Sequence, residues 1–161
     1  MRPRIFVTQP IAESALERLR SIADVTVNPD SSCVLAKDKL CAAVREHDIL
    51  FALLHDTVDK DVLTANPKLM AVASMSANAD RIDVAVATAL RIPVTVIMPI
   101  AVTESTADLH FAILLSVARR VVEGDRLIRS GSFPGAQSNL LAGAWVCGKT
   151  LGLVGGKGRI G

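Results

Sequence analysis

Short apolar runs alternate with amphipathic stretches over residues 1–98. The apolar runs have the length of buried strands, and the amphipathic stretches place apolar side chains at helical spacing, as Leu16, Leu19 and Ile22 do. Strands are predicted at residues 5–8, 25–27, 49–54, 69–73 and 93–96, and helices at 11–22, 35–46, 60–65 and 81–90. Strands that alternate with helices at this pace predict an α/β domain with an open parallel sheet covered on both faces.

The pattern changes at Pro99. Residues 102–129 contain no proline and a single glycine, and residues 109–122 are apolar on nearly every side of a helix. A helix of this kind is buried all round, so we expect it to lie between domains or between subunits, with Thr103 or Ser105 as its N-cap. We therefore predict one domain over residues 1–98 and the beginning of a second over residues 99–161.

A glycine pattern follows the next predicted strand. Residues 150–154 are apolar enough for a buried strand, and Gly156, Gly158 and Gly161 then form G-x-G-x-x-G. In a dinucleotide-binding βαβ unit these glycines allow a tight turn, a close approach of backbone to pyrophosphate and the packing of the following helix. The pattern indicates the start of a Rossmann domain, and we expect that helix to lie beyond Gly161.

Charge and composition argue against two classes of partner. The 161 residues carry 18 Lys and Arg and 16 Asp and Glu, scattered along the chain, so no nucleic-acid partner is expected. The longest apolar run, residues 109–118, is shorter than the roughly 18 residues that span a membrane. Hydrophobic residues reach 50% and aromatics only 3%, a mixture that suits buried parallel strands.

The three cysteines show no C-x-x-C spacing. Cys33, Cys41 and Cys147 are an odd number and sit far apart, which is typical of reduced thiols in a cytoplasmic protein. The N-terminal residues lack the pattern of a secretory signal, so a cytoplasmic location is expected. No spacing of His, Cys, Asp or Glu predicts a metal site.

Residues 143–150 match the sequence of a phosphate-binding P-loop, G-x-x-x-x-G-K-T. A functional P-loop needs a strand before it and a helix after it, whereas here a polar loop precedes and a predicted strand follows. The context favours a turn, and P-loop nucleotide binding stays a minor alternative that predicts loss of ATP or GTP binding on Lys149→Ala.

Residues 76–83 follow the fourth predicted strand and precede a helix. Ligands of open α/β sheets bind at the carboxyl ends of strands, where free backbone N–H groups can hold a carboxylate. Asn78 tolerates the left-handed conformation that such a loop can require. Asp80 can instead serve only as the helix N-cap, and both interpretations stay open. Among the histidines, His55 follows a strand end and can face a ligand.

Several segments together resemble the N-terminal half of the D-isomer-specific 2-hydroxyacid dehydrogenases, the family that includes glyoxylate/hydroxypyruvate reductases and phosphoglycerate dehydrogenase. The resemblance covers essentially the whole chain. It rests on Pro-Lys-Leu at 67–69, Asp-Arg-Ile-Asp at 80–83, residues 102–109 with the helix that continues to 131, and Gly-Lys-Thr-Leu-Gly at 148–152.

The resemblance implies a flavodoxin-like substrate domain followed by an NAD(P)-binding domain, and hydride transfer between NAD or NADP and a small 2-oxo or 2-hydroxy acid. Two groups of positions match the family's ligand contacts. The substrate positions are Leu54, His55, Ala77 and Asn78, where the family usually has Gly at the last; the cofactor positions are Thr106, Gly156, Gly158, Arg159, Ile160 and Gly161. The resemblance also implies a homodimer formed through the helix at 102–129.

The family's catalytic Arg, Glu and His have no counterpart within these residues, so no catalytic residue is assigned. We expect an N-terminal portion of such a dehydrogenase that is inactive alone. A non-catalytic dimerising or ligand-binding module is the alternative, and it predicts a stable dimer that binds no dinucleotide.

Overall fold

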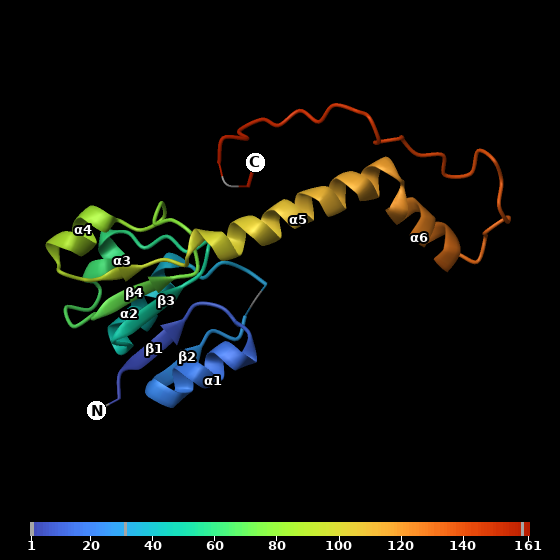
Figure 1. Cartoon of the computed structure of the whole chain (residues 1–161). Coiled ribbons are helices and arrows are strands. Elements are labelled where there is room, and N and C mark those ends of the chain that lie inside the picture. The colour runs from blue at the N-terminus through green and yellow to red at the C-terminus, as the bar shows by residue number, and fades with distance from the viewer. Residues whose placement is uncertain (1, 31, 159) are drawn as a thin grey trace. The chain divides into compact units, whose positions relative to one another are not determined.

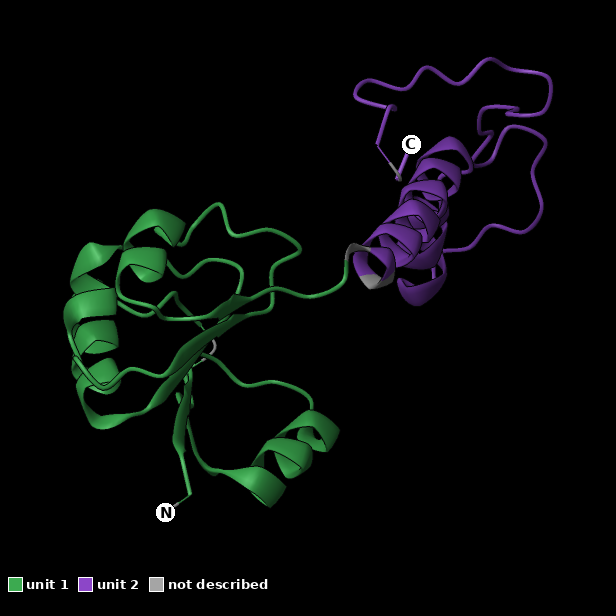
Figure 2. Ribbon diagram, turned by 60° about the vertical axis from the view of Figure 1, so that its left-hand side comes forward, with its two compact units in different colours: residues 1–98 green, residues 99–161 purple. Residues whose placement is uncertain are grey.

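The computed structural model describes residues 2–30, 32–158 and 160–161, and the chain divides into two compact units, residues 1–98 and 99–161 (Figure 2). Each unit has its own elements and is described by itself. The division falls at Pro99, where the apolar pattern of the sequence changes.

The first unit is built on a parallel sheet (Figure 1). Its strands are β1 (Arg4–Val7), β2 (Asp24–Val27), β3 (Ile49–Ala52), β4 (Ala71–Ser74) and β5 (Val94–Thr95). The strands lie in the order β2-β1-β3-β4-β5, and all four pairs are parallel. This is the flavodoxin-like order, whose direction of winding reverses between β1 and β3. The predicted parallel α/β fold is confirmed.

Helices cover the sheet unequally. The helices of this unit are α1 (Glu13–Ile22), α2 (Lys37–Glu46), α3 (Lys60–Thr64) and α4 (Val84–Ala89). The last three share one face of the sheet, while α1 lies on the opposite face (Figures 1 and 2). Right-handed connections between parallel strands produce this arrangement when the winding reverses within the sheet.

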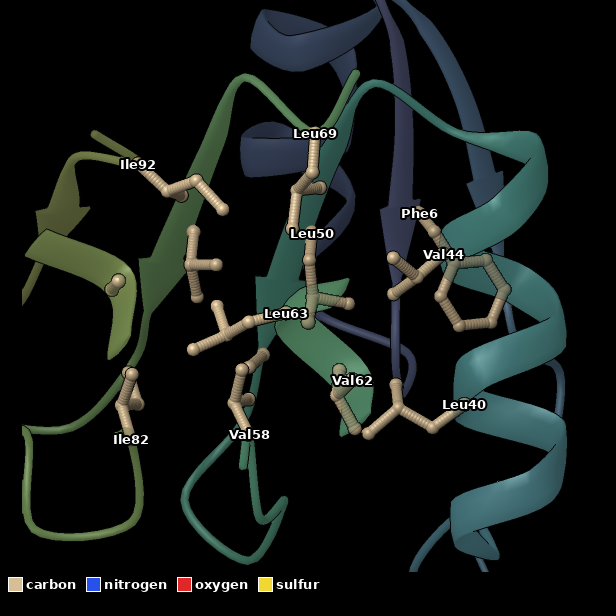
Figure 3. Packing of buried hydrophobic residues seen from close by; sticks show 13 residues of the cluster. Phe6, Leu40, Val44, Leu50, Val58, Val62, Leu63, Leu69, Ile82 and Ile92 are labelled. Atoms are coloured by element: carbon tan, nitrogen blue, oxygen red, sulfur yellow. The ribbon is translucent and has the colours of Figure 1, made fainter. Parts of the chain in front are cut away.

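The main core lies between the sheet and the helices α2, α3 and α4 (Figure 3). Leu50 and Val72, from the interior strands β3 and β4, are 1% and 0% exposed, and Leu40 and Val62 join the same cluster from α2 and α3. A smaller cluster of Ile5, Val7 and Ala23 lies under α1 on the other face. Burying this apolar area on both faces fixes the strand ends, and hence the loops that leave them.

The second unit contains α5 (Pro99–Ala118) and α6 (Val121–Arg129). The sequence predicted one helix over residues 102–129, and that prediction is wrong in two respects. The helix begins at Pro99, so Thr103 lies inside it, with its Oγ1 bonded to the Ile100 carbonyl at 3.2 Å rather than capping the end. The helix also breaks at Arg120, which has a left-handed backbone (φ 53°) of the kind that ends helices.

At the break, a backbone carbonyl of α5 accepts a hydrogen bond from a residue outside the helix. The Ala144 amide donates to the Ala118 carbonyl at 2.7 Å, replacing a helical partner of that carbonyl. Gly143 approaches so closely that a Cβ atom there would lie 2.3 Å from the same oxygen. A carbonyl at the end of a helix lacks its usual helical partner and needs another donor. The segment with Gly143 and Ala144 supplies that donor.

The predicted strand at residues 150–154 does not form, since the described residues of this unit contain no strand. A parallel strand is stable only beside another strand that completes its hydrogen bonds. Leu151 and Leu153 are accordingly 52% and 60% exposed. Within this chain α5 exposes Phe111 and Val117, and its burial between domains or between subunits stays a prediction. None of the helices described in the structure is long and apolar enough to cross a membrane.

Candidate functional site

A cavity of about 130 Å³ opens at the carboxyl edge of the sheet, between the loops that follow β3 and β4. Its lining combines apolar and polar side chains from these loops: Ala52, Leu53, Leu54, Asp56, Ser74, Ser76, Asn78, Asp80, Arg81 and Ile82. A larger groove of about 680 Å³ between α1 and Phe51 is lined mainly by apolar side chains. Converging polar groups at a carboxyl edge make the smaller cavity the candidate ligand site.

The loop after β3 forms a turn closed at both ends. The Asp56 amide donates to the Leu53 carbonyl at 3.2 Å, and the Leu53 amide donates to Asp56 Oδ2 at 2.7 Å. Leu54 and His55 therefore occupy the tip of the turn, and both are exposed. Leu54 lines the cavity, whereas His55 is not among the lining residues.

The loop after β4 is organised by its own polar side chains. Ser76 Oγ donates to Asn78 Oδ1 at 3.0 Å, and Asn78 Nδ2 donates to Asp80 Oδ2 at 2.6 Å. The Asn78 amide forms a long bond of 3.4 Å to Ser76 Oγ, while the Ala77 amide has no acceptor among the described residues. The loop thus keeps the Ala77 amide available as a donor next to the cavity, although Ala77 is not among the lining residues.

Asp83, and not Asp80, caps the following helix. Asp83 Oδ1 accepts a hydrogen bond from the Val86 amide at 3.0 Å, so α4 begins at Val84. Residues 81–82 are drawn away from the helix because Ile82 bridges Val58. The prediction that Asp80 serves as the cap is wrong, and its carboxylate is bonded to Asn78 within the loop instead.

Of the residues that line the cavity, only Leu54 and Asn78 were predicted as site residues from the sequence, and the polar or charged ones that were missed include Asp56, Ser74 and Arg81. Arg81 supplies a guanidinium group to the lining, and its Nη1 donates to Thr57 Oγ1 at 3.4 Å. Its place in the Asp-Arg-Ile-Asp segment was the available signal. Asp56 and Ser74 gave no such signal, because they reach the cavity only through the pairing of β3 with β4.

The predicted cofactor positions lie in the second unit. Thr106 is half-buried on α5, where its Oγ1 donates to the Val102 carbonyl at 2.6 Å. Gly156, Gly158 and Ile160 lie in an exposed segment without regular structure, and Arg159 lies outside the described residues.

Two of the glycines at the predicted cofactor positions, Gly156 and Gly161, lie close together. A Cβ on Gly161 would lie 2.3 Å from the Gly156 carbonyl oxygen, so the two backbones touch in a way only glycine permits. At these two positions the residues present fit a close glycine turn of the kind that a dinucleotide site uses. The described residues show no helix after this loop.

The P-loop alternative finds no support in the geometry. Gly143 packs on the Ala118 carbonyl, and no helix follows Thr150 in the described part of the chain. Without a helix N-terminus facing the loop, the glycine and lysine of this segment lack the arrangement that binds phosphates. The described residues also hold no cluster of His, Cys, Asp and Glu suited to a metal ion.

Comparison with known proteins gives consistent relatives. The family described as D-isomer specific 2-hydroxyacid dehydrogenase, catalytic domain, matches residues 5–142. The glyoxylate reductase of Aeropyrum pernix is 42% identical over 164 residues, covering 99% of this chain and 48% of that protein. The glyoxylate reductase of Korarchaeum cryptofilum is 41% identical and is matched over 100% of this chain and 48% of its own length.

Solved structures agree with this. A proposed NAD-binding D-isomer specific 2-hydroxyacid dehydrogenase from Polaromonas sp. JS6 66 superposes with a TM-score of 0.90 at 28% identity, covering 99% of this chain and 50% of that one. The NADPH-dependent glyoxylate/hydroxypyruvate reductase of Sinorhizobium meliloti, in complex with NADP and malonate, has a TM-score of 0.70 at 29% identity, covering 99% and 48%. The chain spans about half the length of the curated relatives it matches.

Proposed function

Because this chain belongs to the D-isomer specific 2-hydroxyacid dehydrogenase family, we propose that it forms the substrate-binding part of an NAD(P)-dependent oxidoreductase, together with the beginning of the cofactor-binding part. Residues 1–98 provide the substrate domain, and residues 99–161 begin the nucleotide-binding domain. The substrate is a small 2-oxo acid, with glyoxylate or hydroxypyruvate as the first candidates, since the similar proteins are glyoxylate reductases and a glyoxylate/hydroxypyruvate reductase.

The observation that carries this proposal is the cavity at the carboxyl ends of β3 and β4. Its volume, about 130 Å³, suits a molecule of only a few heavy atoms. Arg81 contributes a cation, and the Ala77 amide in the adjoining loop has no acceptor among the described residues. A carboxylate accepts bonds from both kinds of donor, and charge-assisted bonds are the stronger ones. Leu54 supplies an apolar wall that limits the size of the acid.

The cofactor part of the proposal rests on the glycine loop. Gly156, Gly158 and Gly161, with the amides of Arg159 and Ile160, would hold the pyrophosphate of NAD or NADP, and Thr106 would lie near its nicotinamide end. The bound nicotinamide supplies or accepts the hydride of the reaction. The lining of the described cavity contains no histidine, and its two carboxylates, Asp56 and Asp80, both accept hydrogen bonds within the protein. We therefore propose that the group exchanging the proton lies elsewhere in the whole protein.

The substrate site is tested by titrating ¹⁵N-labelled 161-residue chain with glyoxylate and with malonate while following the Ala77 and Asn78 amide signals. The proposal predicts saturable shifts at both amides. Arg81→Ala should weaken binding by about tenfold, the loss of one charge-assisted hydrogen bond. Arg45→Ala, which removes an exposed arginine from α2, is the control and should leave binding unchanged. Absence of saturable shifts, or an equal loss in both variants, contradicts the proposal.

Catalysis gives a second readout. The 161-residue chain should oxidise no NADH or NADPH in the presence of glyoxylate, because no histidine lines the described cavity and both of its carboxylates are hydrogen-bonded within the protein. Sustained cofactor oxidation by the purified chain would overturn the proposal that the group exchanging the proton lies elsewhere in the whole protein.

Exposed apolar side chains around α5 support a further part of the proposal, a homodimer formed through residues 102–129. Phe111 and Val117 are 60% and 73% exposed, with Leu109 and Ile113 also exposed on the same helix. Apolar surface of this extent marks an interface. A stable dimer that binds neither glyoxylate nor dinucleotide would favour the dimerising-module alternative instead.

A further inference from the structure

Thr8 and Asp56 form a buried pair at the reversal point of the sheet. Thr8 directly follows β1 and is 0% exposed, while Asp56 lies in the turn after β3 and is 4% exposed. The Thr8 hydroxyl donates a hydrogen bond to the Asp56 carboxylate across the ends of the two strands. In open α/β sheets the crevice at such a reversal point is the usual ligand site. Here these two side chains bridge it.

The same carboxylate organises the turn that reaches the candidate cavity. The Leu53 amide donates to Asp56 Oδ2 at 2.7 Å and lies 3.1 Å from Thr8 Oγ1. The Asp56 amide returns to the Leu53 carbonyl at 3.2 Å. One buried carboxylate thus joins β1 to both ends of the turn whose tip is Leu54. A buried carboxylate is costly unless hydrogen-bonded, so these partners hold it in one position.

We propose that Asp56, oriented by Thr8, is a positioning residue for substrate: the pair closes the crevice between β1 and β3 and sets the turn so that Leu54 bounds the cavity between β3 and β4. This inference rests on the proposed function for its substrate. The cavity is small, so a movement of the turn by even one side-chain width changes which acids fit. Specificity for a small acid is then set partly from β1, although Thr8 does not line the cavity.

A role in stability alone makes a different prediction. If the pair only stabilised the domain, its loss would lower protection of every core amide together and leave the folded cavity intact. A positioning role requires a local effect on the turn and on ligand affinity in protein that remains folded.

The experiment compares Thr8→Val, which keeps the shape but removes the hydroxyl, with Thr8→Ser, which keeps the hydroxyl. In the 161-residue chain, amide hydrogen exchange is measured at Leu53 and Asp56 in the turn and at Val72 in β4, and malonate affinity by the titration described above. Thr8→Val should accelerate exchange in the turn by about tenfold relative to Val72 and weaken malonate binding by a similar factor. Thr8→Ser should keep both the exchange rate in the turn and the malonate affinity close to those of the unaltered chain.

Equal acceleration at Leu53 and Val72, or unchanged malonate affinity in Thr8→Val, overturns the proposal. Asp56→Asn adds a second arm, since the amide oxygen can still accept from Leu53 while the charge is lost. It should weaken malonate binding less than Asp56→Ala does, and equal losses would contradict positioning through hydrogen bonds. If the unaltered chain binds neither malonate nor glyoxylate, the proposed function fails, whereas the exchange measurements still decide whether the pair holds the turn.

Discussion

The Asp83 amide donates a hydrogen bond to the Val58 carbonyl at 2.9 Å, and the Val58 amide donates to the Arg81 carbonyl at 2.8 Å. These bonds join the loop after β3 to the loop after β4, the two walls of the candidate cavity. Val58 is 0% exposed, so the connection is shielded from water. The cavity walls are therefore tied to each other as well as to the sheet, which favours a preformed site.

Asp83 also caps α4, and removing its side chain should destabilise this wall. Asp83→Ala leaves the backbone bond to Val58 but removes the acceptor of the Val86 amide. We expect the free energy of unfolding to fall by about 1 kcal/mol, the usual value of an N-cap, measured by urea denaturation. Asp80→Ala is the control, because Asp80 caps no helix and should cost less than about 0.5 kcal/mol. Equal losses would contradict the assignment of the cap.

Gly143 should tolerate no side chain. A Cβ there would lie 2.3 Å from the Ala118 carbonyl oxygen, so Gly143→Ala must displace the segment and break the bond from the Ala144 amide. We expect hydrogen exchange at the Ala144 amide to accelerate by about tenfold or more. Gly152→Ala is the matched control, since nothing lies within 4 Å of a Cβ at that position. Unchanged exchange at Ala144 would show that this close approach does not persist in solution.

Association of the chain should depend on α5. Phe111→Glu and Val117→Glu each place a charge where the proposed dimer buries an apolar side chain, at a cost of about 2 kcal/mol or more. Sedimentation should show the dissociation constant of the dimer rising at least about tenfold for either variant. Met70→Glu, which changes an exposed apolar residue of the first unit, should leave association unchanged. Weakening by all three variants would indicate non-specific aggregation instead of a dimer through α5.

The sequence predicted the order of elements in the first unit well, because each apolar run supplies a strand buried by neighbouring strands and helices. Its errors lie at the ends of elements. The third strand was predicted to extend through Leu54 but ends at Ala52, since Leu53 and Leu54 are drawn into the turn held by Asp56. That hydrogen bond, and the one from Thr8 to Asp56, depend on tertiary neighbours. The periodicity of the local sequence therefore does not predict them.

In the second unit, local sequence pattern predicted the elements less well. Residues 150–154 have the composition of a buried strand, yet a strand requires neighbouring strands that the described residues of this unit do not provide. The helix break at Arg120 likewise has a partner far along the chain, the Ala144 amide, which donates to the Ala118 carbonyl. Local pattern therefore predicted helical character around the break but could not place the break itself.

Asp48 should make stability depend on pH below neutrality. The Arg4 amide, at 2.8 Å, and then the Arg4 guanidinium hold the pKa of the Asp48 carboxyl below its ordinary value, joining the start of β1 to the residue before β3. A carboxylate with a lowered folded-state pKa stabilises the fold fully above its unfolded pKa of about 3.9, and that contribution is lost as the pH falls through the lower folded value. Asp48→Asn should therefore lower the free energy of unfolding by about 1 kcal/mol or less at pH 7, with solvent screening taken into account, and by progressively less below about pH 4.

Urea denaturation at pH 7 and pH 3 measures this difference, with Glu17→Gln on the exposed side of α1 as the control. A cost that stays the same at both pH values would mean that the Asp48 side chain acts through its shape and not through its charge.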